Sequence, residues 1–177
     1  MTTFFHDRLS SPIGEILIVS DGARLRALDF DEYEERMWML LRRQYGEVTL
    51  EPRANPGGAT DAMKQYFAGE LNAIDSLATS SCGSAFQERV WKKLREIPTG
   101  SVWSYGELAK ALGNANASRA VGMANGKNPI AIVVPCHRVI GADGSLTGYG
   151  GGMARKRWLL AHEGYSVDEG VQAALNF

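Results

Sequence analysis

The residue pair with the clearest chemical potential is Cys136–His137, which follows an apolar run and Pro135 in the segment IAIVVPCHRVI. A thiol has a pKa of about 8.5, so a nucleophilic cysteine needs a base or a cation nearby. Neighbouring residues of an extended strand point to opposite sides, so a water molecule or a third group would have to connect these side chains. The alternative is structural, with Cys136 a small buried hydrophobic residue and His137 a hydrogen-bonded core residue.

Two short helices are predicted upstream of this pair. Residues 105–112 are expected to form a helix ending at Gly113, and a second helix begins near Ala117 after an Asn-rich turn. Two short helices joined by such a turn are typical of a helix-turn-helix. Most side chains of the second helix around Arg119 are small: they are those of Ala117, Ser118, Ala120, Gly122, Ala124 and Gly126. It either packs tightly on another helix or approaches a narrow groove of DNA.

The other predicted elements divide the chain near residue 80. Strands and turns are expected over 4–30, where turn signals separate alternating apolar residues. Helices are expected at 32–45, 61–71 and 84–97, the last capped by Ser84 and with one apolar face. The small, polar segment IDSLATSSCGS reads as a linker, NPGG at 55–58 as a loop, and the apolar run from 130 to Pro135 as a buried strand.

Composition limits the class of protein. The chain has 177 residues, 45% of them hydrophobic and 22% charged, which suits one large domain or two small ones. No uncharged apolar run reaches the ~18–20 residues of a membrane span, and the first residues do not resemble a secretory signal. Two cysteines, Cys82 and Cys136, are too few for a disulfide scaffold. We therefore expect a soluble, cytoplasmic protein.

Charge is distributed unevenly along the chain. Residues 1–80 carry 8 basic and 13 acidic side chains, whereas residues 81–165 carry 11 basic and 5 acidic ones. The second half therefore favours an anionic partner such as nucleic acid, although charges also cluster by chance. The basic stretch RKRW at 155–158 is compatible with phosphate contacts and equally with a solvated helix face.

The segment PCHRV, with NPIAIVV before it and GSLTGYGGGMARKRWLLAHEG after it, resembles the active-site segment of the O6-alkylguanine-DNA alkyltransferases. These are also called methylated-DNA–protein-cysteine methyltransferases. The resemblance extends upstream through FQERVWKKLREIPTGSVWSYGELA and SRAVGMANGKNP and covers roughly residues 84–165. In the first half, SPIGEILIV, NPGG and YFAGEL resemble the amino-terminal domain of the constitutive bacterial members.

The resemblance implies an α+β fold with two domains. Residues 1–80 would form an N-terminal α/β ribonuclease-H-like domain with a small antiparallel sheet and flanking helices. Residues 84–165 would form a mostly helical alkyltransferase domain with a (winged) helix-turn-helix that binds DNA. The tail, 166–177, is not covered by the resemblance.

The resemblance also implies catalytic roles for three residues. Cys136 would accept the alkyl group from guanine O6 and form a permanent thioether. His137 would act on the thiol through a water molecule, and Glu163 would orient the histidine and balance its charge, in the order nucleophile, base and orienting group. Without the resemblance, Glu163 would be a solvated residue at a helix end.

DNA contacts are assigned to the helix-turn-helix in the same way. A base stacked in a duplex cannot reach a buried thiol, so the base must be rotated out of the helix. Arg119 would enter the stack in its place, and Tyr105 would crowd the adjoining phosphate. Ser118, Ala120 and Gly122 would lie on the DNA-binding helix. From the residues alone, Tyr105 would belong to the core and Arg119 would be a phosphate contact.

The lesion pocket is implied by further positions. Tyr149 would donate its hydroxyl to guanine O6 as negative charge develops there. Val139 would offer backbone contacts to the base, and Asn128 would tie the DNA-binding helix to the active-site strand. Gly150 also lies in this pocket, where mammalian members carry a serine. We expect no cofactor, and no zinc either, because Cys82 and His6 are the only soft ligands before the site.

The expected function is DNA repair by stoichiometric transfer from O6-alkylguanine, and also O4-alkylthymine, in double-stranded DNA to Cys136 of a monomer. Two other classes remain open. A lesion-binding module without chemistry has no need of the set Cys136, His137 and Glu163. A Cys-His hydrolase has no need of a small-residue helix centred on Arg119.

Overall fold

The computed structural model describes residues 1–167, which form two compact units. The first unit comprises Met1–Gly83 together with Pro129–Val133, and the second comprises Ser84–Asn128 and the chain from Val134 onward. The chain thus returns briefly to the first unit just before Cys136. The predicted boundary near residue 80 did not include this return. Most of the predicted tail, from position 168 on, lies outside the described residues.

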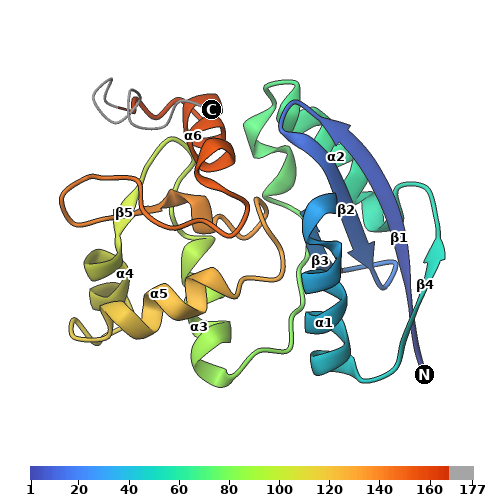
Figure 1. Ribbon diagram of the computed structural model, residues 1–177. Helices are drawn as coiled ribbons and strands as arrows, with labels where there is room; N and C mark the ends of the chain where they lie inside the picture. Colours follow the sequence, from blue (N-terminus) through green and yellow to red (C-terminus); the bar gives the residue numbers. More distant parts are fainter. Residues whose placement is uncertain (168–177) are drawn as a thin grey trace. The chain divides into compact units, whose positions relative to one another are not determined.

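The first unit is built on a four-stranded sheet with the order β3-β2-β1-β4 (Figure 1). Strands β1 (Thr2–Ser11), β2 (Gly14–Ser20) and β3 (Leu25–Phe30) are antiparallel neighbours, as the turn signals over 4–30 predict. A fourth strand, β4 (Val48–Pro52), pairs in parallel with β1 and was not predicted.

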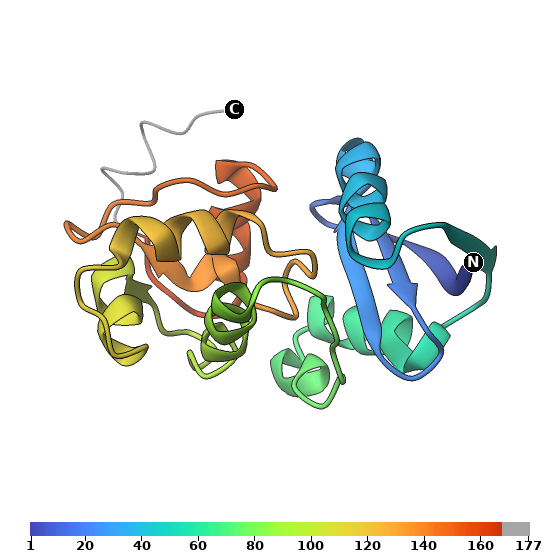
Figure 2. The ribbon, with the colours of Figure 1, turned by 90° about the horizontal axis from the view of Figure 1, so that it is seen from below.

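Two helices cover the two faces of this sheet (Figure 2). Helix α1 (Glu34–Tyr45) buries Met37 and Leu41 against Leu17 and Val19 of β2, which share one face of the strand. Helix α2 (Ala59–Phe67) begins and ends earlier than predicted, and a separate 3-10 turn follows at Leu71–Ile74. The NPGG segment is not a plain loop, because Pro56–Gly58 forms a short 3-10 helix.

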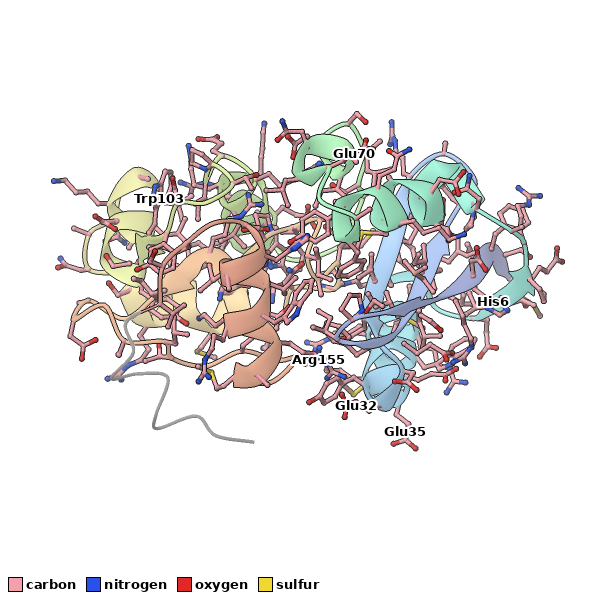
Figure 3. The ribbon with its side chains drawn as sticks, turned by 90° about the horizontal axis from the view of Figure 1, so that it is seen from above. His6, Glu32, Glu35, Glu70, Trp103 and Arg155 are labelled. Atoms are coloured by element: carbon pink, nitrogen blue, oxygen red, sulfur yellow. The ribbon has the colours of Figure 1, made fainter. Side chains whose placement is uncertain are left out.

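The second unit is mostly helical. It contains α3 (Ala85–Leu94), α4 (Tyr105–Ala111), α5 (Ser118–Gly126) and α6 (Met153–His162), with a two-stranded parallel sheet of β5 (Trp103–Ser104) and β6 (Val139–Ile140). Trp103 marks β5 and Arg155 marks α6 in Figure 3. Capping boxes begin α3 at Ser84 and α4 at Ser104, and each satisfies two backbone N–H groups. Among the described residues, no helix is long and apolar enough to cross a membrane.

The predicted strand from residue 130 to Pro135 is wrong. The run is buried, but only Ile130 makes a bridge, to Leu28 of β3, and the chain then turns at Ile132, whose φ is 69°. Proline has no N–H to donate to a strand ladder, and both Pro129 and Pro135 bracket the run. Cys136 therefore lies on a 3-10 helix, Cys136–Arg138 (η4), rather than at the end of a strand.

Candidate active site and nucleic-acid interface

Cys136 begins the η4 turn and is nearly buried, with 6% of its surface exposed. The Cys136 N–H donates to the carbonyl oxygen of Val134 at 2.8 Å. Two amide side chains hold the same turn: Asn128 Nδ2 donates to the Val134 oxygen at 2.8 Å, and Asn125 Nδ2 donates to the Cys136 oxygen at 3.4 Å. Asn128 thus links the end of α5 to the turn that carries the thiol. Asn125, which makes a similar link, was not among the predicted site residues.

His137 pairs with Glu163 at the end of α6, and both side chains are fully buried. The distance from His137 Nε2 to Glu163 Oε1 is 2.9 Å. Because an ionised carboxylate can only accept, Nε2 carries the proton and Nδ1 of the neutral ring keeps its lone pair. Nδ1 is buried and makes no hydrogen bond within the described residues. This tautomer leaves Nδ1 able to act as a base.

Arg138 completes the cluster and was missed from the sequence. Its Nε and Nη2 donate to the two oxygens of Glu163 at 2.8 and 2.9 Å, in the two-pronged geometry that suits a carboxylate. Its Nη1 donates to the Ile97 oxygen at 2.8 Å, and Nη2 also reaches Thr99 Oγ1 at 3.3 Å. Arg138 thereby fixes Glu163, which in turn fixes the ring of His137.

These contacts shift the pKa values of the pair. Burial alone would raise the pKa of Glu163, but the contacts with His137 and Arg138 outweigh it and hold that pKa far below its usual range. Burial lowers the pKa of His137, although the Glu163 carboxylate opposes the shift. Glu163 is therefore ionised and His137 neutral at physiological pH, which is the protonation state that a base at Nδ1 requires.

Lys156 corrects the interpretation of the RKRW stretch, because its side chain is neither solvated nor available to phosphates. It is fully buried, and its Nζ donates to the carbonyl oxygens of Val139 at 2.5 Å and Thr147 at 2.7 Å. Burial lowers the pKa of Lys156 to about 8, and the nearby Cys136 opposes that shift. The same attraction stabilises a thiolate at Cys136, since a nearby cation favours the charged form of a thiol.

The lysine also ties the glycine-rich loop to the strand that follows the thiol. Val139 lies in β6, Thr147 lies in the loop before α6, and Lys156 bridges the two. Tyr149, two residues after Thr147, is half-buried with its hydroxyl oxygen shielded from solvent, and Gly150 is exposed. The backbone carbonyl oxygen of Tyr149 accepts from the Gly152 N–H at 3.0 Å, at the start of α6.

Helices α4 and α5 form the helix-turn-helix (Figure 1). The half-buried Tyr105 lies against Gly122, where an added Cβ would meet the tyrosine ring at 3.6 Å. Val121 and Ala124 face inward, and the Ala124 carbonyl accepts from Trp91 Nε1 of α3 at 2.9 Å. Tight packing thus explains the inward small residues.

Packing does not explain the outward small residues of α5. Arg119, Ala120 and Gly126 are exposed, and Ser118 is half-buried. The positions beside Arg119 on the first turn of α5 are therefore small, as a helix that approaches another surface closely would require. Among the described residues, no group of three or more His, Cys, Asp or Glu side chains could hold a metal ion.

The fold and site together define a class: two-domain proteins in which a helix-turn-helix unit carries a buried cysteine beside a histidine–carboxylate pair. Two family models match this chain. Residues 5–80 match the 6-O-methylguanine DNA methyltransferase, ribonuclease-like domain, and residues 85–165 match the DNA binding domain of the same family. The chain belongs to the 6-O-methylguanine DNA methyltransferase family, as the resemblance predicts.

Similar proteins extend over nearly the whole chain. A methylated-DNA–protein-cysteine methyltransferase of Shigella flexneri is 51% identical over 168 residues, 93% of this chain and 98% of the relative. The Mycobacterium tuberculosis OGT, solved in complex with DNA, superposes with a TM-score of 0.75 at 44% identity and covers 90% of this chain and 92% of its own. An O6-methylguanine-DNA methyltransferase of Pyrococcus kodakaraensis gives 0.73 at 28% identity, covering 91% of this chain and 99% of its own. These matches agree with a ribonuclease-like domain followed by a DNA-binding domain.

Proposed function

We propose that this chain repairs O6-alkylguanine in double-stranded DNA by moving the alkyl group onto Sγ of Cys136. The observation that carries the proposal is the placement of Cys136 next to His137, whose Nε2 is bound to Glu163 and whose Nδ1 is left as a base. The DNA-binding domain of the family model covers all three residues.

The chemistry is a single displacement at the alkyl carbon. His137 Nδ1 accepts the thiol proton through a water molecule, and the Lys156 cation stabilises the thiolate. Sulfur attacks the alkyl carbon, the S–C bond forms and the bond from that carbon to O6 breaks. Guanine leaves with the bonding pair on O6, stabilised by a hydrogen bond from the Tyr149 hydroxyl, and is then protonated. The reaction consumes the thiol and needs no cofactor.

Access to the buried thiol requires the damaged nucleotide to leave the base stack. We place Arg119, on the outward face of α5, in the vacated space, and Tyr105 beside the adjoining phosphate. Ser118 and Ala120 let the helix approach the groove closely, and Gly122 makes room for the ring of Tyr105 behind it. Val139 and Gly150 would line the pocket for the extruded base. O4-alkylthymine carries the same alkoxy group on an aromatic ring, so the proposal includes it as a second substrate.

A stoichiometry measurement tests the proposal. Repaired lesions are counted against moles of protein, using duplex DNA with one O6-methylguanine, and the yield is expected to saturate at one lesion per protein molecule. A thioether offers water no leaving group, so the protein cannot regenerate. Product in several-fold excess over protein would indicate a hydrolase, and binding without loss of the methyl group would indicate a lesion-binding module. Size-exclusion chromatography would test our expectation of a monomer.

A further inference from the structure

The outward face of α5 carries one large apolar side chain that the proposed chemistry does not use. Met123 is 61% exposed, and it lies one turn beyond Arg119 on the same face of the helix. Lys127, four residues further on, is exposed as well. The other exposed members of this face, Ala120 and Gly126, are small. Met123 therefore projects beyond these small neighbours, midway between two cations.

We propose that Met123 is an apolar DNA contact, which packs against the minor-groove edge of the duplex. This inference rests on the proposed function, because it requires α5 to lie on DNA. Arg119 and Lys127 are each about 6 Å from Met123 along the helix axis, one on either side. Cations at both ends favour an anionic partner, and an apolar side chain between them suits the apolar contacts that minor-groove proteins make between base steps.

The chain provides a matched control on another helix. Met39 of α1 is also 61% exposed, but its helical neighbours four residues away are Glu35 and Arg43, which carry charges of opposite sign. Figure 3 labels Glu35, which projects away from the sheet of the first unit. Both methionines are thus exposed, but of the two only Met123 lies between two cationic side chains.

The experiment measures equilibrium binding of the full chain to unmodified duplex DNA over a range of salt concentrations. Met123→Ala is expected to weaken binding about tenfold, or ~1.4 kcal/mol, without changing the slope of log K against log salt, because no phosphate contact is lost. Met123→Leu should bind like the wild type, and so should Met39→Ala. Lys127→Gln should instead lower the slope by about one. Reaction with free O6-benzylguanine should be unchanged in Met123→Ala, since a free base has no groove.

Three outcomes would overturn the inference. The first is binding by Met123→Ala within twofold of the wild type, and the second is a salt slope that falls as in Lys127→Gln. The third is an equal loss of the free-base reaction, which would assign Met123 to the fold or the pocket. Failure of the proposed function is distinguishable, because the wild-type protein would then leave O6-methylguanine in duplex DNA unrepaired, whatever Met123→Ala does to binding.

Discussion

Replacing Arg138 by methionine tests the cluster that orients the ring of His137. The substitution keeps an unbranched apolar stem but shortens the side chain, and it removes two hydrogen bonds to Glu163, one to Ile97 and one to Thr99. Hydrogen bonds to charged groups contribute about 1.5–3 kcal/mol each, and breaking a buried ion pair costs about 3–5 kcal/mol. Since Glu163 would stay buried with only His137 as its partner among these contacts, we expect unfolding free energy to fall by ~3–5 kcal/mol.

Urea unfolding of the wild type, Arg138→Met and Arg138→Lys measures this loss. Lysine keeps the charge but lacks the two-pronged geometry, so its free energy of unfolding should lie between the other two. A second readout is the pH dependence of Cys136 alkylation by iodoacetamide. The Arg138 cation contributes to the lowered pKa of His137, so in Arg138→Met the pKa of His137 should rise and alkylation at mildly acidic pH should slow.

Two results would refute this reasoning about Arg138. A loss below about 1 kcal/mol in Arg138→Met would mean that the Glu163–Arg138 contact does not stabilise the fold, since exposed ion pairs give values of that size. An unchanged pH profile of alkylation would mean that the Arg138 charge does not affect the pKa of His137.

Three further predictions concern pH, the buried Lys156 and the exposed Arg119 of α5. The free energy of unfolding should fall as pH drops below ~6.5, because the folded state holds the pKa of His137 below that of the unfolded chain. It should fall further below ~4.5, where protonation removes the stabilising contribution of ionised Glu163. Urea unfolding at several pH values checks both steps, and a flat profile would contradict them. Lys156→Met should lower the free energy of unfolding, because two carbonyl oxygens lose their donor. It should also raise the pKa of the Cys136 thiol, because the nearby cation is lost. Iodoacetamide alkylation against pH measures this second effect, and an unchanged thiol pKa would mean that Lys156 does not stabilise the thiolate. Arg119→Ala should slow repair of duplex lesions by one to a few powers of ten but slow reaction with free O6-benzylguanine far less, because a free base needs no extrusion; equal slowing of both substrates would assign Arg119 to the fold.

Elements with a strong local signal could be predicted from the sequence. The turns and alternation over 4–30, the capping residue Ser84 and the glycine-containing turn before α5 are each determined by residues close together in the chain. The apolar run after Pro129 could not be interpreted in this way. Burial and hydrophobicity are shared by strands and by packed turns, and only the partner strand decides between them.

Charged residues that the fold buries were hidden for a different reason. Arginine and lysine are usually exposed, so Arg138 and Lys156 gave no local sign of their partners. Lys156 nevertheless lies three and four residues before the buried Leu159 and Leu160, on the inward face of α6. That spacing could have indicated that Lys156 is buried. For Arg138, the only indication of a role was its position next to the Cys136–His137 pair.

The most direct test of the central claim is a peptide mass map of the protein after incubation with duplex DNA that contains O6-methylguanine. We predict that one methyl group replaces the thiol hydrogen on the peptide with Cys136, and that the exposed Cys82 stays unmodified. Cys136→Ser should show no methylated peptide while still binding the DNA. Loss of the methyl group from DNA with an unmodified Cys136 peptide, or with the methyl group on any other residue, would contradict the account.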